Sequence, residues 1–414
     1  MTGLERVRVA VVGAGPAGLT AAAALAGTID GEVRVLEREA EPGGIPRHSD
    51  HTGYGLRDLR RVVTGPAYAR RLAEAADAAG AVVATRTMVT GWDGERRLEV
   101  TAPSGRHVLE ADAVVLATGA RERSRMARLI PGDRVAGVYT TGQLQQLVHQ
   151  HHARVGRRAV VVGAESVSWS AVLTLRESGC ATELMTTIHP RAEAYGVFTL
   201  IGRLGWQIPV ATRTRIVRIN GSTRVTSVEI EQLDTGARRR VECDTVIVTG
   251  DWIPDNELAR AAGLDLDPAT RGPIVDAALR TSSDGVFAAG NVVHPVDTAD
   301  VAALDGRHVA EQVRGWLAGH TDRAPGSRIE AQAPLLWITP QILRVGDPAP
   351  PRRHYLLWTD RYVRTPCIEV HQDGRRLAAR RLPWPAAPGR AVRLPAELLH
   401  HADPQGGTVR VSLG

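Results

Sequence analysis

The sequence predicts an α/β protein with two Rossmann-like domains, the second inserted in the first, and a small β-rich domain at the C-terminal end. Three observations lead to this fold class. A strand, glycine-rich turn and helix near Gly13 recur in altered form near Gly163. The apolar segment 285–291 has the pattern of a late strand that returns the chain to the first domain. Beyond a polar linker at 319–334, short β-like runs alternate with Pro and Gly.

The first predicted unit begins with an apolar strand at Val9–Val12, as expected of a parallel strand buried on both faces. The turn Gly13-Ala14-Gly15-Pro16-Ala17-Gly18 follows, and an Ala-rich helix is predicted over 16–26. A second strand is predicted over 32–36, with Glu37 at its carboxyl end. This order of strand, turn, helix and strand is the context that a dinucleotide-binding fingerprint requires.

Each glycine of this turn has a separate function. Gly13 permits the tight turn, Gly15 lets the backbone approach a pyrophosphate, and Gly18 lets the helix pack closely on the strand. The helix N-terminus supplies amides and a favourable dipole for the phosphates. Glu37 can accept hydrogen bonds from ribose hydroxyls. The first unit is therefore predicted to bind a dinucleotide.

The second unit repeats this plan with two of its glycines replaced. A helix is predicted after 140–142, a strand over 159–162, and further strands over 182–185 and 246–250. In the turn, Gly163 is kept, but Glu165 and Ser168 stand at the second and third glycine positions. The Glu165 carboxylate is expected to repel phosphate and to fill the space that glycine leaves open.

A second feature of this unit also disfavours a nicotinamide dinucleotide. The strand after the turn ends at Met185-Thr186-Thr187, without an acidic residue to hold an NAD ribose. Arg191 could meet a 2′-phosphate, but a solvated loop arginine is the simpler interpretation. Productive NAD(P)H binding is therefore not expected here, and a non-redox nucleotide has no stronger support.

Composition narrows the class of protein. The chain has 414 residues and a formal net charge of +6, and it contains no Lys, which excludes Schiff-base chemistry. Short clusters such as Arg238-Arg239-Arg240 are expected to be solvated faces, so no nucleic-acid partner is predicted. No apolar run is long enough to span a membrane, and Met1–Glu5 leads directly into a strand. These features predict a cytoplasmic protein.

Cysteine and histidine usage excludes several kinds of site. The widely spaced Cys180, Cys243 and Cys367 predict no disulfide framework, no CxxC redox pair and no iron–sulfur cluster ligated by this chain. The run His149-Gln150-His151-His152 suggests a metal site, but no further ligand, and no residue placed to orient such ligands, accompanies it in the sequence. A solvated helix end is expected there, and no metal is predicted.

Two later segments favour FAD as the dinucleotide of the first site. Ala117-Thr118-Gly119 and Phe287–Asn291 resemble the two later signatures of FAD domains, in which the final position is usually Asp and bonds the ribityl chain or pyrophosphate. By the same resemblance, the N-terminus of a helix predicted over 297–312 faces the flavin pyrimidine ring and stabilises the charge of the reduced flavin. The residues predicted to bind FAD are Gly13, Gly15, Pro16, Ala17, Gly18, Glu37, Arg38, Gly43, Gly44, Ile45, Thr118, Gly119, Gly290, Asn291 and Ala299.

Longer segments resemble one group of flavoproteins. The segments 41–48, 250–256 and 288–291 are similar to those of the α subunits of heteromeric amine and amino-acid dehydrogenases and oxidases. Opine oxidase, hydrogen cyanide synthase, dye-linked proline and hydroxyproline dehydrogenases and sarcosine oxidase have such subunits. The resemblance covers about 7–317 and implies a partner subunit that carries its own flavin, with a small iron–sulfur subunit as a further candidate. Relatives often have Cys where this chain has Ser49.

Flavin hydride transfer needs little from the protein beyond the positioning of groups and their electrostatics. Three residues that could approach the flavin ring are therefore candidates for catalysis. His48 and Asp50 lie in the loop after the glycines at 43–44, together with His51, and His294 follows the segment that ends at Asn291. The alternative is that this loop only packs or binds a partner.

The function predicted is an FAD-dependent oxidoreductase, the α-type subunit of an enzyme that oxidises the C–N bond of an amine, imino acid or amino acid. Two alternatives remain, a stand-alone NAD(P)H-dependent flavoprotein reductase and a non-catalytic nucleotide-binding scaffold subunit. The predicted domains are 1–135 with 266–320 for FAD, 136–265 for the degenerate NAD(P)-like unit, and 330–414 for the β-rich domain.

Overall fold

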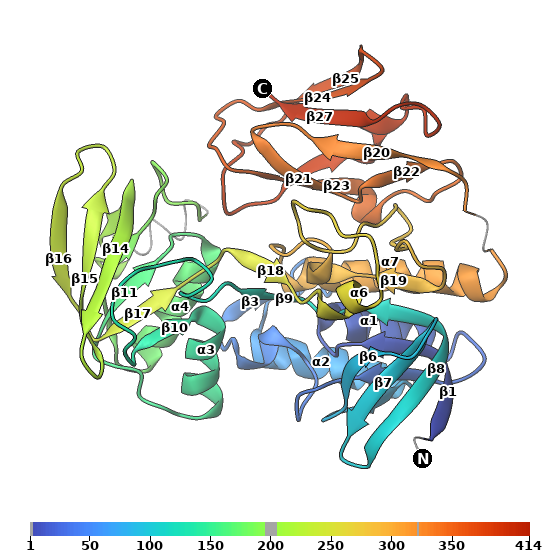
Figure 1. The fold of residues 1–414 in the computed structure, drawn as a ribbon, viewed down its shortest axis with the longest axis horizontal. Coiled ribbons are helices and arrows are strands. Elements are labelled where there is room, and N and C mark those ends of the chain that lie inside the picture. The colour runs from blue at the N-terminus through green and yellow to red at the C-terminus, as the bar shows by residue number, and fades with distance from the viewer. Residues whose placement is uncertain (1–2, 195–204, 321–322) are drawn as a thin grey trace. The chain divides into compact units, whose positions relative to one another are not determined.

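The computed structural model describes residues 3–194, 205–320 and 323–414. The chain divides into two compact units (Figure 1). One comprises Met1–Arg47, Gly53–Ala120 and Pro254–Gly414, and the other comprises His48–Thr52 and Arg121–Ile253. The domain boundaries that the sequence suggested stay predictions.

A seven-stranded sheet forms the centre of the first unit. Strand β1 (Leu4–Val12) lies between β2 (Val33–Leu36) and β8 (Gly105–Leu116) and pairs with both in parallel. The last residues of β1 are buried on both faces, which explains its unbroken apolar run. The other strands are β5 (Val82–Ala84), β6 (Met88–Trp92), β7 (Arg97–Ala102) and β19 (Val286–Ala288), and β19 pairs with β8 in parallel.

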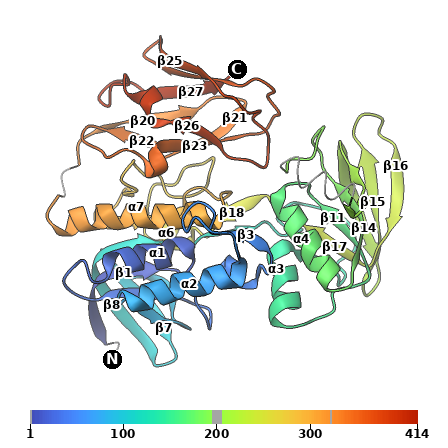
Figure 2. The same ribbon diagram turned by 180° about the vertical axis from the view of Figure 1, so that it is seen from behind.

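Helices α1 (Pro16–Leu25), α2 (Gly65–Ala78) and α7 (Ala299–Leu317) belong to the same unit. Figures 1 and 2 show α7 running beside α1. Gly306 makes this close approach feasible, because a Cβ on it would lie 2.1 Å from the backbone oxygen of Ala17. The return of the chain through β19 and α7 therefore completes the domain that begins with the glycine turn.

The C-terminal part of this unit consists of two sheets around their own apolar core. The sheet of five has the order β22-β20-β27-β24-β25, and the sheet of three has the order β21-β23-β26. Their bounds are β20 (Gly326–Ala331), β21 (Leu335–Thr339), β22 (Ile342–Arg344), β23 (His354–Thr359), β24 (Cys367–Gln372), β25 (Arg375–Arg381), β26 (Val392–Pro395) and β27 (Val409–Leu413).

The second unit has a parallel sheet in the order β10-β17-β11-β12-β13. Its strands are β10 (Val138–Thr140), β11 (Arg158–Val162), β12 (Ala181–Thr186), β13 (Val210–Ala211) and β17 (Thr245–Val248). Helices α3 (Thr141–Gln145) and α4 (Ser166–Glu177) follow β10 and β11, and an antiparallel sheet is formed by β14 (Thr214–Gly221), β15 (Val225–Gln232) and β16 (Arg238–Glu242). The predicted fold class, with two Rossmann-like domains and a β-rich C-terminal part, is confirmed.

Short elements complete the part of the chain that the structure describes. They are η1 (Ile45–His48), β3 (Thr52–Tyr54), β4 (Val63–Thr64), β9 (Ala120–Glu122), η2 (Gln146–Gln150), β18 (Trp252–Pro254), α6 (Glu257–Ala261), η3 (Gly290–Val292), η4 (Pro351–Arg353) and η5 (Ala396–Leu399). None of the described helices has both the length and the apolar character needed to cross a membrane.

Candidate functional site

The first glycine turn has the close packing that its sequence predicts. Gly13 has a φ of +104°, and a Cβ on it would lie 2.5 Å from the backbone oxygen of Ala117. A Cβ on Gly18 would lie 1.9 Å from the Gly13 oxygen, so α1 can meet β1 only through glycine. Around Gly15, by contrast, no atom lies within 4 Å of the Cβ position. This open space lies at the N-cap of α1, where backbone amides can receive phosphate oxygens.

Glu37 is fixed at the edge of this turn. It is 8% exposed, and its two carboxylate oxygens accept hydrogen bonds from the backbone amides of Ala14 at 2.8 Å and Glu39 at 2.9 Å. A carboxylate oxygen can accept more than one hydrogen bond, so each retains capacity for a ribose hydroxyl. The carboxylate is therefore oriented before any ligand arrives.

The loop at Gly43 and Gly44 packs directly on the turn. The amide of Gly43 donates to the Ala14 oxygen at 2.8 Å, and a Cβ on Gly44 would lie 3.0 Å from the Gly15 Cα. Both glycines have positive φ, +125° and +62°. Ile45 follows as the first residue of η1 and is exposed. The structure thus brings this loop and the α1 N-terminus together.

Thr118, Gly119 and Arg38 converge on Asp255. The Thr118 hydroxyl donates to the Asp255 backbone oxygen at 2.7 Å, and the Asp255 amide donates to the Gly119 oxygen at 3.0 Å. The Arg38 side chain, 61% exposed, lies 3.6 Å from the Asp255 carboxylate. Sequence reasoning missed Asp255 as a member of this group, although its segment belonged to the pattern that suggested the family resemblance.

Asn291 presents a polar atom without a partner. Its amide nitrogen donates to the Asp297 backbone oxygen at 3.1 Å, whereas its Oδ1 atom is buried and has no partner in the described chain. A buried acceptor without a donor is costly, and a ligand hydroxyl would satisfy it. Gly290 beside it contacts α1, because its Cβ would lie 2.8 Å from the Ala17 Cβ. Pro16 and Ala17 are the first two residues of α1, and Ala299 begins α7.

Arg57 and Asp300 meet at the N-terminus of α7, which the sequence did not indicate. Asp300 is 3% exposed and accepts hydrogen bonds from the Arg57 amide at 3.0 Å and guanidinium at 3.2 Å. Close by, the Tyr68 hydroxyl donates to Asp58 at 2.5 Å, and burial raises the pKa of the Asp58 carboxyl. The first turn of α7 therefore carries a fixed ion pair beside the helix dipole.

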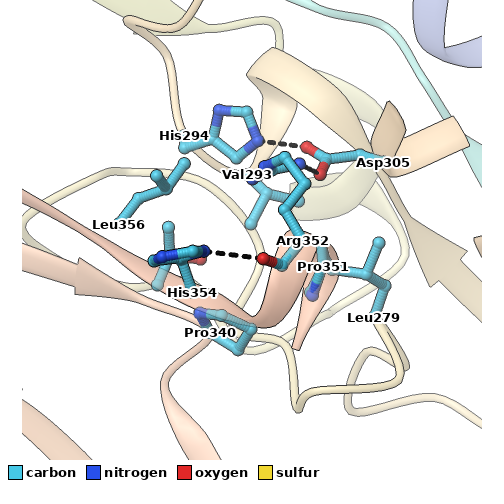
Figure 3. A pocket seen from close by; sticks show the side chains of 10 residues that line it. Leu279, Val293, His294, Asp305, Pro340, Pro351, Arg352, His354 and Leu356 are labelled. Carbon is cyan, nitrogen blue, oxygen red and sulfur yellow. Dashed lines mark hydrogen bonds and ion pairs between the residues drawn. The ribbon is translucent and has the colours of Figure 1, made fainter. Parts of the chain in front are cut away.

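His294 lies in a buried pocket beneath the C-terminal sheets. Its ring nitrogen Nε2 bonds to Asp305, and Asp305 also pairs with Arg352 from η4 (Figure 3). Burial alone would raise the pKa of Asp305, but Arg352 and His294 outweigh it and lower the pKa to about 2. Pro340 and His354 line the opposite side. The catalytic role of His294 stays a prediction, and its visible role is to hold this pocket together.

His48 and Asp50 belong to the second unit, whereas His294 belongs to the first. His48 is buried, and its backbone oxygen bonds to the His149 ring at 2.5 Å. Asp50 is exposed. Within the same loop, the His51 Nε2 atom bonds to the Ser170 hydroxyl at 2.7 Å. These contacts attach the loop to its unit, and the catalytic assignments of His48 and Asp50 stay predictions.

The histidine run lies at the end of η2, as the sequence suggested, but His149 is not solvated there. His149 is largely buried, since its ring bonds to the His48 backbone oxygen and, at 2.8 Å, to Glu177. The two histidines beyond it, His151 and His152, are both exposed. In the described ranges no group of three or more His, Cys, Asp or Glu is arranged to hold a metal ion.

The second glycine turn is filled by its own glutamate. The Glu165 carboxylate accepts a hydrogen bond from the Ala164 amide at 3.0 Å and another from the Thr249 hydroxyl at 2.7 Å. It also lies against Gly250, whose Cβ would be 2.3 Å from the Glu165 oxygen. Ser168 supports the arrangement, because its hydroxyl bonds to that of Thr249 at 2.7 Å. A negative charge is therefore built into the position where phosphate approaches in an intact turn.

Two further carboxyl groups lie near Glu165. Glu193 accepts a hydrogen bond from the Thr187 hydroxyl at 2.7 Å, and burial together with the Glu165 charge raises its pKa to about 7. Glu122 accepts from the backbone amide of Gly250 at 3.2 Å, and burial raises its pKa. Arg191 lies in the exposed loop after β12. The Arg128 guanidinium, which donates to the Gly250 backbone oxygen, lies near Glu165 and Glu122, so the three carboxyl groups and this cation surround the turn.

The two nucleotide-binding domains define an FAD/NAD(P)-dependent oxidoreductase. The family model described as pyridine nucleotide-disulphide oxidoreductase matches residues 7–306, so the chain belongs to that family. Proteins of the family bind FAD and NAD(P).

Two similar relatives belong to different redox systems. An opine oxidase subunit of Rhizobium meliloti is 29% identical over 336 residues, which cover 73% of this chain and 61% of the relative. A second relative is the biphenyl dioxygenase system ferredoxin–NAD(+) reductase component of Paraburkholderia xenovorans. It is 31% identical over 297 residues, which cover 69% of this chain and 67% of the relative. The match thus spans about three-fifths of the length of the opine oxidase subunit.

A solved structure supports the fold. L-proline dehydrogenase from P. horikoshii superposes with a TM-score of 0.56 at 19% identity, covering 77% of this chain and 57% of that chain. At this identity the likeness concerns the fold alone. The predicted family resemblance is confirmed by the family match and by the opine oxidase relative.

Proposed function

We propose that this chain is the FAD-binding, α-type subunit of a heteromeric dehydrogenase or oxidase that oxidises the C–N bond of an amine, imino acid or amino acid. The similarity to the opine oxidase subunit supports the reaction class and the need for a partner. The partner would carry the flavin at which the substrate is oxidised, and this chain would help to pass the electrons onward. FAD, when bound, supplies two-electron redox chemistry.

The residues of the first site suit FAD. The amides at the N-terminus of α1 would hold the pyrophosphate at the open position beside Gly15. Glu37, already oriented by two backbone amides, would accept the ribose hydroxyls. The buried Oδ1 of Asn291 would accept a hydroxyl of the ribityl chain. Gly43, Gly44 and Ile45 would cover this position.

The observation that carries the proposal is the bonding of Glu165 into the second turn. A subunit that receives its electrons from a partner has no use for a nicotinamide site, whereas a stand-alone reductase requires one. Glu165 is held by Ala164 and Thr249 and cannot leave without breaking both hydrogen bonds. Phosphate would therefore meet a fixed charge, which at about 4 Å costs roughly 4 kcal/mol near a protein surface.

A stand-alone NAD(P)H-dependent reductase is the second candidate. The 31% identity to a ferredoxin–NAD(+) reductase component favours it. The Glu165 carboxylate bonded into the second turn weighs against it, and so does the absence of an acidic residue at the end of β12. A scaffold subunit that binds a nucleotide only for structure is the third candidate.

One experiment separates the three candidates. The purified chain is examined by visible spectroscopy and is then mixed anaerobically with NADH and with NADPH. A yellow protein whose flavin bands do not bleach supports the subunit. Rapid bleaching would establish the reductase instead, and a colourless protein that cannot be loaded with FAD would leave the scaffold.

A further inference from the structure

The net positive charge of the chain is concentrated in its C-terminal part. Residues 326–414 contain 13 arginines and seven acidic residues. Their formal net charge is therefore +6, the same as that of the whole protein. The remaining residues carry 38 basic and 38 acidic side chains. The nucleotide-binding domains are therefore balanced, and the β-rich part alone is basic. A local excess of this kind favours association with an acidic surface.

Four of these arginines lie on one edge strand. Strand β25 has the sequence Arg-Arg-Leu-Ala-Ala-Arg-Arg. Among the strands that the structure describes, it pairs with β24 alone, and its outer edge is unpaired (Figures 1 and 2). Arg376 pairs with Glu369 at 3.2 Å, and Arg380 pairs with Glu397. In the described chain, Arg375 and Arg381 have no carboxylate within ion-pair distance, and all four are exposed. Two guanidinium groups without an ion pair therefore lie at the two ends of β25, Arg375 on the face of Gln372 and Arg381 on the opposite face, with Cys367.

An exposed tryptophan follows the strand. Trp384 is 76% exposed and is flanked by Pro383 and Pro385. It follows Arg381 by only three positions, so its backbone lies within about 10 Å of the strand end. The prolines limit the backbone conformations of this segment. Trp and Arg are among the residue types that contribute most to the energy of protein–protein interfaces.

Charged residues on an edge strand also have a simpler explanation, because they prevent strands of separate molecules from pairing. That function needs only the arginines. Protection of the edge strand gains nothing from a neighbouring exposed tryptophan, because the ring adds apolar area to a surface that should stay polar. The combination of free arginines and an exposed aromatic ring is instead the composition of a binding surface.

We propose that the β25 surface, formed by Arg375, Arg376, Arg380, Arg381 and Trp384, binds an acidic face of the partner subunit. The proposal rests on the proposed function, which requires such a subunit. The partner meets the outer edge of β25, where Arg375 and Arg381 pair with its carboxylates at the two ends of the strand, and Trp384 enters an apolar depression of the partner beside Arg381. Nucleic acid is the less favoured occupant, because the proposed function already requires a protein partner.

The test uses the native complex. The chain is tagged in its source organism, the complex is purified, and any subunit present in equal amount is identified by mass spectrometry. The subunits are separated at high salt, and rebinding is measured by surface plasmon resonance. Arg375→Glu with Arg381→Glu is expected to weaken rebinding by about 10-fold or more. Trp384→Ala is expected to weaken it by about 30-fold.

The matched control is Arg70→Glu with Arg71→Glu. These arginines are exposed on α2, and the variant changes the net charge equally, but it should leave rebinding unchanged. A photo-crosslinking benzoylphenylalanine at position 384 is expected to react with a peptide rich in Asp and Glu. Circular dichroism of every variant should match that of the parent chain, because the substituted side chains are exposed.

The outcomes separate the two proposals. Rebinding that is unaffected by the β25 substitutions, or a crosslink to a basic or uncharged peptide, overturns the docking surface and leaves the proposed function intact. The absence of any subunit in equal amount overturns both. Copurifying nucleic acid that is lost in the β25 variants overturns the docking surface in favour of a nucleic-acid site.

Discussion

The hydroxyl of Thr249 donates a 2.7 Å hydrogen bond to the carboxylate of Glu165, and this pair closes the second nucleotide turn. Glu165→Gly removes the charge and restores the space for a pyrophosphate. We expect the variant to bind ADP-ribose at least 10-fold more tightly than the parent chain, because a fixed repulsion of a few kcal/mol is lost. Isothermal titration calorimetry measures the two dissociation constants.

Glu165→Gln is the matched control for this prediction, because it removes the charge but keeps the bulk. It should gain less affinity than the glycine variant. If neither variant binds ADP-ribose better than the parent chain, Glu165 is not what closes the site.

Glu37 is expected to determine FAD affinity at the first turn. Glu37→Ala removes the group that accepts hydrogen bonds from the Ala14 and Glu39 amides and, in the proposed complex, from the ribose. Hydrogen bonds to a charged group contribute about 1.5 to 3 kcal/mol, so FAD should bind about 10-fold to 100-fold more weakly. Flavin fluorescence titration of the deflavinated protein measures the change.

Glu39→Gln provides the control for this measurement. Its side chain is 52% exposed in the same loop, and FAD affinity should stay within about a factor of two of the parent value. Equal affinities of the Glu37 variant and the parent chain would mean that FAD does not use this carboxylate.

The elements around the two glycine turns could be predicted because their signals are local. The helix expected over 16–26 is α1 at Pro16–Leu25, and the strand expected over 159–162 is β11 at Arg158–Val162. An apolar run, a glycine turn and an Ala-rich segment specify these elements without reference to distant residues. The replacement of glycine by Glu165 was visible for the same reason.

Contacts between distant segments could not be predicted in this way. Arg57 and Asp300 are 243 residues apart, and Glu193 reaches the neighbourhood of Glu165 through a loop. Such pairs depend on loop paths, for which single residues carry little information. The ties of His149 to His48 and Glu177 were missed for the same reason, because both partners come from other segments.

Gly306 on α7 should tolerate no side chain. In Gly306→Ala the new Cβ would lie 2.1 Å from the Ala17 backbone oxygen, so α7 would have to move away from α1. Overpacking of this kind costs about 1 to 3 kcal/mol, and thermal denaturation should show a lower melting temperature. FAD content should fall too, because α1 carries the glycine turn.

Gly315→Ala on the same helix is the control for Gly306. Its nearest neighbour would be the His320 ring at 3.6 Å, which is an ordinary contact, and the substitution should stabilise the helix by up to about 1 kcal/mol. Destabilisation of similar size in both variants would show that the contact with Ala17 is not the cause.

Glu193 should make the second unit less stable as the pH rises. Burial and the Glu165 charge raise its pKa from 4.5 to about 7, so the folded chain holds a proton that the unfolded chain loses between these values. The free energy of unfolding should therefore fall by about 3 kcal/mol from pH 4.5 to pH 7 and then level off. Glu193→Gln, which cannot ionise, should lack this part of the decline when urea denaturation is followed across the range. Glu242→Gln, an exposed substitution on β16, is the control and should show the same decline as the parent chain. If the decline in Glu193→Gln is as large as in the parent chain, another group causes the effect.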